Sequence, residues 1–253
     1  MSITNSALVN YLADYLNVSK IRDYCPNGIQ VEGKPQIEKI VSGVTASQAL
    51  IDAAIERNAD AILVHHGYFW KGEDPCVRGM KKRRLKALLA HDINLLAYHL
   101  PLDVHPVVGN NAQLAKRLGI EVIGGLDASD PFSVAMQGRF ERSITHANLV
   151  QRLAQELKTT VLSEGDPNRI IETIAWCSGG GQSYIDAAAE QGIDAFLSGE
   201  VSEQTIHTSR EMNIDFFAAG HHATERYGAK ALGEHLQEKF DLDVEFVDIH
   251  NPA

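Results

Sequence analysis

The sequence is poor in cysteine and has no long apolar segment. Its 253 residues include three cysteines that lie far apart and form no CxxC pair, namely Cys25, Cys76 and Cys177. Such a set excludes a cysteine zinc cluster and fits a reducing compartment such as the cytoplasm. No run approaches the ~20 apolar residues that cross a bilayer, and Met1–Asn17 has amphipathic helical spacing rather than the pattern of a signal peptide. We therefore expect a soluble cytoplasmic protein without a membrane segment.

Basic residues are also scarce. The 33 Asp and Glu residues outnumber the 23 Lys and Arg residues, and the formal net charge is −10. This balance argues against a mainly electrostatic nucleic-acid binder, because neutralising phosphates requires a dense basic surface. The segment Arg78–Lys86 is a local exception, since its cations surround Leu85, Leu88 and Leu89 at helical spacing. We interpret it as a solvated helix face, with attraction of phosphate as the alternative.

The sequence does contain apolar, β-branched runs that alternate with segments of helical period. The predicted strands are Lys39–Val44, Ala61–His65, Ile93–Tyr98, Glu121–Leu126, Ile170–Cys177, Ala195–Ser198, Asp215–Ala219 and Asp243–Ile249. The predicted helices are Ser47–Arg57, Gly79–His91, Asn110–Leu118, His146–Leu157, Ser183–Gln191, Ser202–Glu211 and Ala223–Phe240. Runs that are apolar throughout, such as Ala61–Val64, are typical of strands covered by helices on both faces. The alternation predicts an α/β fold with a largely parallel sheet in each half.

One segment of the chain recurs. Ile37–His66 aligns without a gap to Ile171–Glu200, at a constant offset of 134 positions (171 − 37). The residues identical in both copies, numbered in the first, are Ile37, Glu38, Ile40, Gln48, Ile51, Asp52, Ala53, Ala54, Glu56, Asp60, Ala61 and Leu63. Ile93–Ala97 likewise resembles Ile214–Ala218. Because long self-similarity indicates structural repetition, we predict a duplicated strand–turn–helix–strand unit.

The predicted organisation is two pseudo-equivalent α/β halves that face each other across a metal cleft. We place the first half at about residues 1–126, a turn-rich connection at 127–138 and the second half at 139–253. The connection is short and no low-complexity linker is present. We therefore expect a single compact unit rather than two mobile domains.

Imidazoles and carboxylates collect where the predicted strands end, which is where ligands bind in open α/β sheets. These residues are His65, His66, His99, Asp103, Glu200, His221, His222 and Glu225. Imidazole together with carboxylate suits Zn, Mn, Fe, Co or Ni, whereas Ca and Mg prefer oxygen ligands alone. A lone buried histidine is more often a hydrogen-bonded core residue, but the adjacent pair in a duplicated unit favours metal binding.

Spacing adds detail to this interpretation. His221 and Glu225 are four residues apart and would share one face of a helix, and a carboxylate such as Glu225 has two oxygens with which to bridge two metals. Glu200 takes the repeat position of His66, so we expect it to face the same cleft, with a contact to a metal ligand or the substrate as the less favoured role. The glycines of Ser178–Ser183 favour close strand–helix packing, with phosphate binding as the alternative. The sequence offers no recognisable Ser–His–Asp arrangement.

Several motifs resemble one family. VHHGYFWKG (Val64–Gly72), HLPLDVHPVVGNN (His99–Asn111), SGGGQS (Ser178–Ser183), SGEVSEQ (Ser198–Gln204) and GHHATERYG (Gly220–Gly228) look like the GTP cyclohydrolase I type 2 homologs, also called interacting-factor-three-like proteins. The similarity spans nearly the whole chain, including DYCPNGIQVEG at Asp23–Gly33. One departure is His222, because members often carry Tyr after the first His of the GHxxTE motif.

The resemblance implies two divalent metal ions per chain, held by His65, His66, Asp103, His221 and Glu225. His66 and Asp103 would serve one ion and His65 and His221 the other, with Glu225 shared. It also implies a ring-shaped homohexamer, a toroid. His99, Glu200 and His222 are left as candidates for contacts around the ligands or with the substrate.

A metal pair of this kind is typical of hydrolases that activate a bridging water. The leading hypothesis is therefore a metal-dependent hydrolase of a nucleotide or related heterocycle. The alternative is a non-enzymatic ring that stores or senses metal, or scaffolds other proteins. A weaker alternative is a ring that binds nucleic acid through its basic segment.

Overall fold

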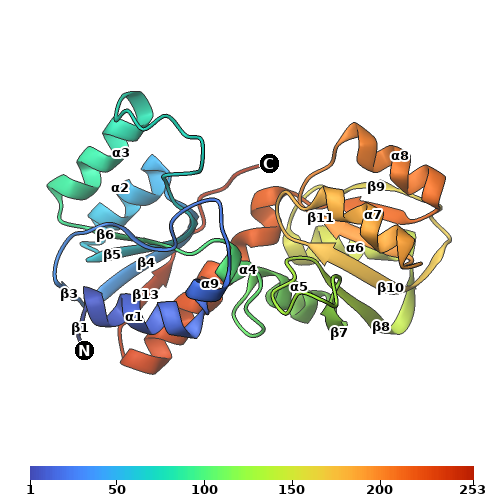
Figure 1. The fold of residues 1–253 in the computed structure, drawn as a ribbon, viewed down its shortest axis with the longest axis horizontal. Coiled ribbons are helices and arrows are strands. Elements are labelled where there is room, and N and C mark those ends of the chain that lie inside the picture. Colours follow the sequence, from blue (N-terminus) through green and yellow to red (C-terminus); the bar gives the residue numbers. More distant parts are fainter. The chain divides into compact units, whose positions relative to one another are not determined.

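The structure, a computed structural model, describes residues 1–253 and has a mixed α/β architecture (Figure 1). The chain forms two compact units. Unit 1 consists of Met1–Gly109 and Gly228–His250, and unit 2 consists of Asn110–Tyr227 and Asn251–Ala253. The predicted α/β fold class is confirmed. No helix combines the length and the apolar composition that crossing a membrane requires.

Unit 1 contains a five-stranded sheet. Its strands are β2 (Gly28–Val31), β4 (Lys39–Thr45), β5 (Ala61–His66), β6 (Asn94–Ala97) and β13 (Asp243–Phe246). Their spatial order is β13-β4-β5-β6-β2, in which β2 is antiparallel to β6 and the other neighbours are parallel. A short antiparallel pair joins β1 (Ile3–Thr4) to β3 (Gln36–Ile37). The largely parallel sheet predicted for the first half is confirmed.

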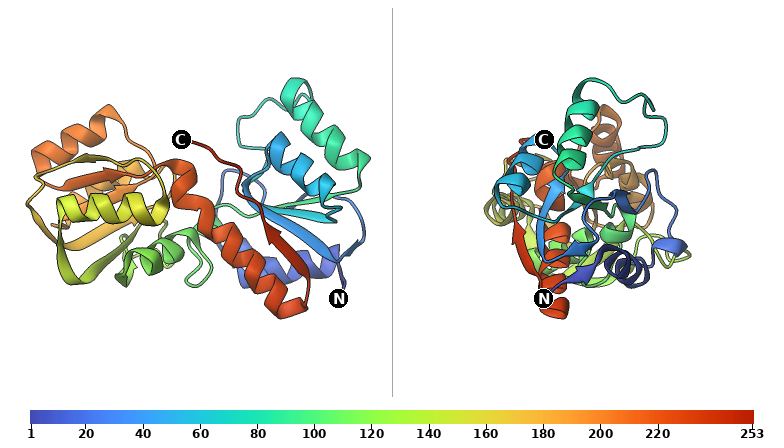
Figure 2. Two further views of the ribbon diagram at one scale, coloured as in Figure 1. Left: turned by 180° about the vertical axis from the view of Figure 1, so that it is seen from behind. Right: turned by 90° about the vertical axis from the view of Figure 1, so that its left-hand side faces the viewer.

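Helices cover both faces of this sheet, as the apolar strands predicted. The helical elements of unit 1 are α1 (Asn5–Tyr15), η1 (Val18–Lys20), α2 (Gln48–Glu56), α3 (Gly79–Ala90), α4 (Leu100–Asp103) and the later part of α9 (His221–Phe240). Leu12 of α1 and Leu232 of α9 pack in one core cluster with Ile40, while α2 and α3 pack against the opposite face with Val41. Figure 2 shows β13 beside β4 within this unit.

Unit 2 contains a six-stranded mixed sheet. Its strands are β7 (Ile120–Gly125), β8 (Met136–Thr145), β9 (Leu162–Glu164), β10 (Ile170–Cys177), β11 (Ala195–Ser198) and β12 (Asp215–Ala218), in the spatial order β7-β8-β10-β11-β12-β9. Only β10, β11 and β12 are parallel to one another. The prediction of a largely parallel sheet was therefore wrong for the second half, because the antiparallel strands β8 and β9 were not recognised.

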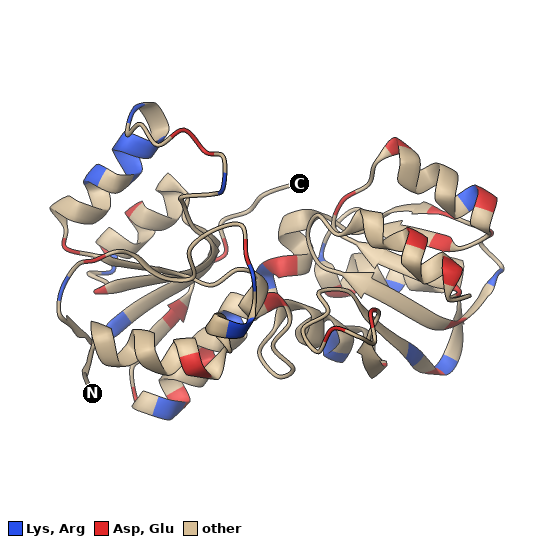
Figure 3. Cartoon of the chain, in the orientation of Figure 1, with Lys and Arg blue, Asp and Glu red and all other residues tan.

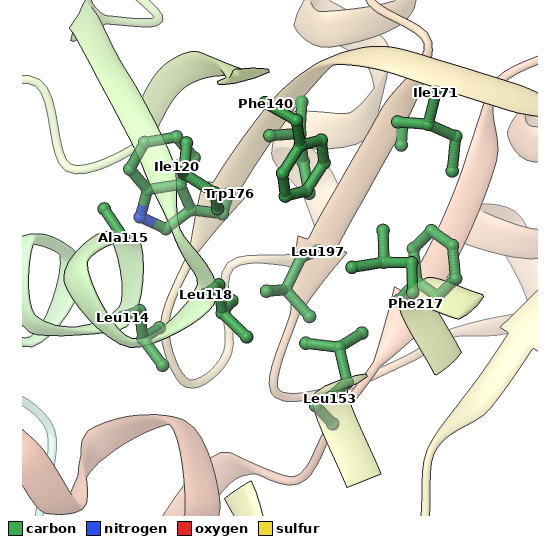
Figure 4. Close-up of a cluster of buried hydrophobic side chains, with 14 of the residues drawn as sticks. Leu114, Ala115, Leu118, Ile120, Phe140, Leu153, Ile171, Trp176, Leu197 and Phe217 are labelled. Atoms are coloured by element: carbon green, nitrogen blue, oxygen red, sulfur yellow. The ribbon is translucent and has the colours of Figure 1, made fainter. Parts of the chain in front are cut away.

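Two helical layers enclose the sheet of unit 2. The elements are α5 (Asn110–Leu118), α6 (His146–Leu157), η2 (Gln182–Tyr184), α7 (Ile185–Glu190), α8 (Glu203–Met212) and the first turns of α9. Leu118 of α5 and Leu153 of α6 pack with Trp176, Leu197 and Phe217 on one face, as Figure 4 shows. The other face buries Ala175 and Phe196 against α7, in a second cluster. Each layer buries an apolar strand face, which is the main favourable term in folding.

The strand registers of the two units correspond, with an offset of 134 for the first two strands and of 121 (215 − 94) for the third. Ile40 pairs with Ala61 between β4 and β5, and Ile174 pairs with Ala195 between β10 and β11. Ala61 then pairs with Asn94, as Ala195 pairs with Asp215. The repeated sequence therefore adopts the same three-stranded parallel arrangement twice, which supports the duplication that the sequence predicted.

An aspartate carboxylate accepts backbone hydrogen bonds near the start of β4 in unit 1 and near the start of β10 in unit 2. Asp60 accepts hydrogen bonds from the backbone N–H groups of Glu38 and Lys39, and Asp194 accepts from those of Glu172 and Thr173. Burial raises the pKa of Asp60, but the Lys34 ammonium and the two N–H donors outweigh it and lower the pKa. The identity of Asp60 and Asp194 in the repeat therefore has a structural cause.

The units are bounded differently from the predicted halves. Residues 110–126 lie in unit 2, because Leu114 and Leu118 pack in its core and β7 pairs with β8. Residues 228–250 return to unit 1, because Leu232 packs in its core and β13 pairs with β4. Sequence order alone did not reveal this return of the chain.

Candidate metal centre

Unit 1 gathers three imidazoles and a carboxylate at the carboxyl ends of β5 and β6. His65 and His66 end the apolar strand β5, and His99 follows β6. The ring centroid of His65 lies 4.5 Å from that of His66 and 5.0 Å from that of His99. The candidate ligand atoms of these three side chains all lie within 4.8 Å of one another. Asp103, 6% exposed, ends the short helix α4.

Hydrogen bonds orient the first two of these imidazoles. Nδ1 of His65 lies 3.0 Å from the carbonyl oxygen of Tyr98, to which it donates, and Nδ1 of His66 lies 3.2 Å from Thr45 Oγ1. Nε2 of His65 lies 3.4 Å from Oδ1 of Asp103. A neutral His65 with its proton on Nδ1 places a nitrogen lone pair opposite this carboxylate. Such an arrangement of two electron donors favours a cation between them.

The loop that follows α1 supplies residues that the sequence reasoning missed. Oδ1 of Asp23 accepts from Nδ1 of His99 at 2.7 Å, and Oδ2 accepts from the backbone N–H of Leu100 at 2.9 Å. Burial raises the pKa of Asp23, but its hydrogen bonds with His99 and Asn27 outweigh this and lower it. The DYCPN motif was part of the family resemblance, and it holds His99 and the start of α4 in place.

Cys25 lies in the same loop. Its Sγ, with Asp23 and His99, belongs to a group whose candidate ligand atoms lie within 4.8 Å of one another. Burial and, second, the charge of Asp23 raise the pKa of Cys25 to about 12. Cys25 is therefore a neutral thiol at neutral pH when no metal is bound.

Unit 2 provides a second set of donors at the carboxyl ends of β11 and β12. His221 opens α9 directly after Gly220, and Glu225 lies one turn later, as the spacing predicted. Nδ1 of His221 lies 2.7 Å from Oε1 of Glu200, and its Nε2 lies 3.0 Å from Oε2 of Glu225. Glu200 thus orients the ring of His221, while Glu225 is 3% exposed. Burial lowers the pKa of His221, but Glu225 and Glu200 outweigh it and raise the pKa to about 9.

The glycine-rich loop lies behind this carboxylate. Gly179 has φ +61°, and a Cβ there would collide with Oε1 of Glu225 and lie 2.9 Å from Nε2 of His221. The loop leads into the turn η2 and the six-residue α7, and Gly181 has no room for a Cβ beside Cys177. Gly179 and Gly181 therefore lie in close contact with their neighbours, and at Gly179 the neighbour is the Glu225 side chain rather than a strand.

We predict that Gly179→Ala weakens metal binding by at least 10-fold, because the new Cβ displaces the carboxylate of Glu225. The left-handed backbone adds a destabilisation of about 1–2 kcal/mol. Gly192→Ala is the matched control, since Gly192 has φ +72° and open space around its Cβ position. Calorimetric metal titration and thermal melting separate the two effects. Equal metal affinity in both variants would show that Gly179 is needed only for its backbone.

His222 follows His221 in α9 but has different contacts. It is 8% exposed, and its backbone N–H donates to the main-chain oxygen of Ala253 at 3.0 Å. Successive helix positions do not face each other, so its ring does not share the direction of His221. The chain with His222 at this position still forms the His221–Glu225 contact.

The structure brings together a Ser–His–Asp series that the sequence did not reveal. Nδ1 of His146 lies 2.8 Å from Oδ2 of Asp215, and its Nε2 lies 3.1 Å from Oγ of Ser163. The three residues come from separate elements, so no local motif marks them. Asp215 opens β12 at the amino end of the parallel strands, where Asn94 makes structural hydrogen bonds in unit 1. We therefore interpret the hydrogen bonds of Ser163, His146 and Asp215 as structural, like those of Asn94.

The basic segment forms α3, as predicted. Arg78 pairs with Asp74 and Lys81 with Glu73, while Lys82, Arg83 and Lys86 are exposed. Figure 3 shows these cations gathered on α3. Leu85 and Leu88 face the core of unit 1. The predicted solvated face is confirmed, and it is a local basic surface on an acidic chain.

Comparison with known proteins agrees with the motifs. A sequence model of Duf34/NIF3 (NGG1p interacting factor 3) matches residues 3–252. The chain belongs to the Duf34/NIF3 family. A relative in Pseudomonas aeruginosa, named GTP cyclohydrolase 1 type 2 homolog, is 56% identical over 255 residues, which cover 100% of both chains. One of the same name in Escherichia coli K12 is 54% identical over 250 residues, which cover 98% of this chain and 99% of the relative.

Two solved structures share this fold over nearly the whole chain. Protein ybgI, described as of unknown function, has a TM-score of 0.96 at 53% identity and covers 99% of this chain and 100% of its own. The protein TTHA1606 from Thermus thermophilus has a TM-score of 0.88 at 34% identity, with the same coverage. The family that the motifs indicated is thus confirmed over nearly the whole chain.

Proposed function

We propose that the protein binds two divalent transition-metal ions per chain and uses them to hydrolyse a nucleotide or a related heterocycle. The observation that carries this proposal is a hydrogen-bonding pattern that three imidazoles share. His65, His66 and His221 each have Nδ1 within hydrogen-bonding distance of an oxygen. A hydrogen bond to one ring nitrogen fixes the tautomer of a histidine that binds metal through the other.

The donor set fits a metal. Asp103 lies beside Nε2 of His65 in unit 1, and Glu225 lies beside Nε2 of His221 in unit 2. Both carboxylates are buried, and burying a charge is costly unless it is paired or coordinates a metal. Mixed nitrogen and oxygen donors suit Zn, Mn, Fe, Co or Ni.

The geometry of unit 1 supports a different division of the ligands from the one that the family resemblance implied. Asp103 lies beside His65, so we assign these two to one ion. His66 and His221 then serve the other ion, and Glu225, with two carboxylate oxygens, is shared.

A bound metal pair would lower the pKa of a water molecule and polarise the group under attack. Glu200 and the carbonyl of Tyr98 hold Nδ1 of His221 and of His65, so that Nε2 of each ring is directed toward a carboxylate. The relatives' name, GTP cyclohydrolase 1 type 2 homolog, supports a nucleotide whose heterocycle is opened by water. We include GTP among the candidate substrates for this reason.

Assembly and location follow from the family resemblance. We propose a homohexameric ring in the cytoplasm, whose size light scattering of the purified protein would measure.

The test combines metal analysis with an unbiased screen for turnover. Elemental analysis is expected to give close to two ions per chain. The metal-loaded protein is then assayed against nucleotides, cyclic nucleotides and phosphoesters, with chelator-treated protein as the control. Stoichiometric metal with no turnover on any of them would favour a protein that stores, senses or scaffolds.

A further inference from the structure

We propose that the basic helix α3 of one copy of the protein docks onto the acidic layer of helices α7 and α8 of a second copy. The proposal rests on the ring assembly proposed above, and it names two surfaces that join neighbouring copies. Each surface belongs to a single unit, and neither contains a candidate metal ligand. A contact between two different surfaces links copies head to tail, and such contacts form a ring if the rotation between copies closes.

The two surfaces are equivalent layers of the duplicated units. α3 connects β5 to β6 in unit 1, and α8 connects β11 to β12 in unit 2. α2 packs beside α3, as α7 packs beside α8. Their charges are opposite, because α3 contains five Lys and Arg residues and no acid, whereas α7 and α8 together contain four acids and one arginine. Figure 3 shows this contrast between α3 and the α7–α8 layer.

The cations of α3 are not neutralised within the chain. Lys82, Arg83 and Lys86 are exposed and form no ion pair. Lys82, Lys86 and Leu89 occupy positions i, i+4 and i+7, so they lie along one side of the helix. Leu85 and Leu88 hold the opposite side in the core of unit 1. The helix therefore presents a fixed row of positive charge to its surroundings.

The carboxylates of α8 likewise have no lysine or arginine partner. Glu203 and Glu211 are exposed and eight positions apart, which places them on one side of the helix. His207 lies between them, 3.9 Å from Glu203, and the only arginine of α8 pairs with a carboxylate of β9. Glu190, at the end of α7, adds another exposed carboxylate. This row matches that of α3 in helical spacing and is opposite in charge.

Exposed apolar side chains accompany both sets of charges. Met80 and Leu89 of α3 are 56% and 60% exposed, and Met212 of α8 is 51% exposed. Exposed ion pairs alone add little affinity, whereas opposite charges select the partner and apolar burial supplies attraction. A second copy provides both features. A nucleic acid would satisfy the cations of α3 and leave the acidic layer of unit 2 without a partner.

The experiment reverses the charge of one surface at a time in the full chain. The variants are Lys82→Glu/Lys86→Glu and Glu203→Lys/Glu211→Lys, and light scattering over a range of concentrations measures their association. Each should weaken association by at least about 10-fold, or about 1.4 kcal/mol, because like charges then meet. Thermal melting checks that every variant is folded.

A matched control makes the same change of net charge elsewhere on unit 2. Glu141→Lys/Glu156→Lys alters exposed residues of β8 and of α6, and α6 packs against the opposite face of the sheet from α7. Its association should equal that of the wild type. Higher salt should weaken wild-type association, because the screening length falls from about 10 Å at 0.1 M to about 3 Å at 1 M.

Mixing the two reversed variants tests the direction of the contact. One variant keeps the acidic α8 and the other keeps the basic α3, so these two surfaces still match. The two altered surfaces also carry opposite charges. An equimolar mixture should therefore assemble, although each variant alone does not.

The outcomes separate this contact from the rest of the proposed function. Weakened association in both reversed variants, with recovery on mixing, supports it, and elemental analysis of these variants then tests metal binding independently. Wild-type association in both would overturn the contact and leave a ring joined by other surfaces. If Lys82→Glu/Lys86→Glu instead loses only affinity for a fluorescent single-stranded oligonucleotide, α3 is a nucleic-acid surface and the contact is overturned. A monomeric wild type would refute the contact together with the ring.

Discussion

We expect Glu225→Gln to lose metal at both positions, with affinities reduced by at least the roughly 10–100-fold that the loss of a group orienting a ligand causes. Glu225 is the one ligand that the proposal assigns to both ions. An amide keeps the size of the side chain but removes the charge and one of the two coordinating oxygens. Elemental analysis after gel filtration, and titration with Zn²⁺ or Co²⁺, measure the loss.

Two variants serve as controls for Glu225. Glu234→Gln removes an exposed carboxylate from the same helix, where it pairs with Lys230, and should leave metal content unchanged. His65→Ala should mainly affect the ion assigned to His65 and Asp103. Full metal content in Glu225→Gln would contradict the shared-ligand assignment, because no other residue in the proposal joins both ions.

The sequence predicted the repeated core of each unit well. β10, β11, α5 and α6 have the bounds that the sequence analysis predicted, and β4 and β5 differ by one residue at an end. The strands are rich in apolar and β-branched residues, and the helices are amphipathic. Their periodicity is therefore strong enough to be read locally.

The antiparallel strands were not predicted. β8 carries buried Phe140 and Ile144 among exposed charges such as Arg139 and Glu141, and β9 is three residues long. Edge and half-exposed strands have weak local patterns, and their pairing depends on distant partners. The return of α9 and β13 to unit 1 is likewise a tertiary event without a local signal.

At the site, the sequence analysis identified the candidate metal ligands but not all of the residues that hydrogen-bond to them. His65, His66, Asp103, His221 and Glu225 stood out because they follow apolar runs in a repeated frame. Asp23 and Tyr98 did not, since they act through a loop and a backbone carbonyl. The offset of 134 did identify Glu200 as a residue at an equivalent strand end, and the structure places it 2.7 Å from Nδ1 of His221.

We expect Asp103→Ala to reduce metal-dependent turnover by about 100-fold or more. A metal ion contributes several kcal/mol to the transition state, and each 1.36 kcal/mol is a factor of ten in rate. Removing Asp103 takes away a buried carboxylate 3.4 Å from Nε2 of His65 and leaves one ion without its charged partner in unit 1. The measurement is kcat/KM on the substrate found in the screen, with metal content determined in parallel. Asp103→Asn tests whether the charge or the shape of the side chain matters.

Arg83→Ala on the exposed face of α3 distinguishes this chemistry from substrate attraction. If the basic helix guides an anionic substrate, the variant should raise KM at low salt and leave kcat unchanged, because exposed charges are screened beyond about 8 Å at physiological ionic strength. Loss of kcat in Asp103→Ala together with salt-dependent KM in Arg83→Ala would place catalysis at the metals and recruitment at α3. If the wild type keeps its turnover after chelation, and the Asp103→Ala variant keeps it as well, the metal pair takes no part in the reaction. Steeply salt-dependent binding of nucleic acid that Arg83→Ala weakens, without any turnover, would favour the nucleic-acid ring over the hydrolase.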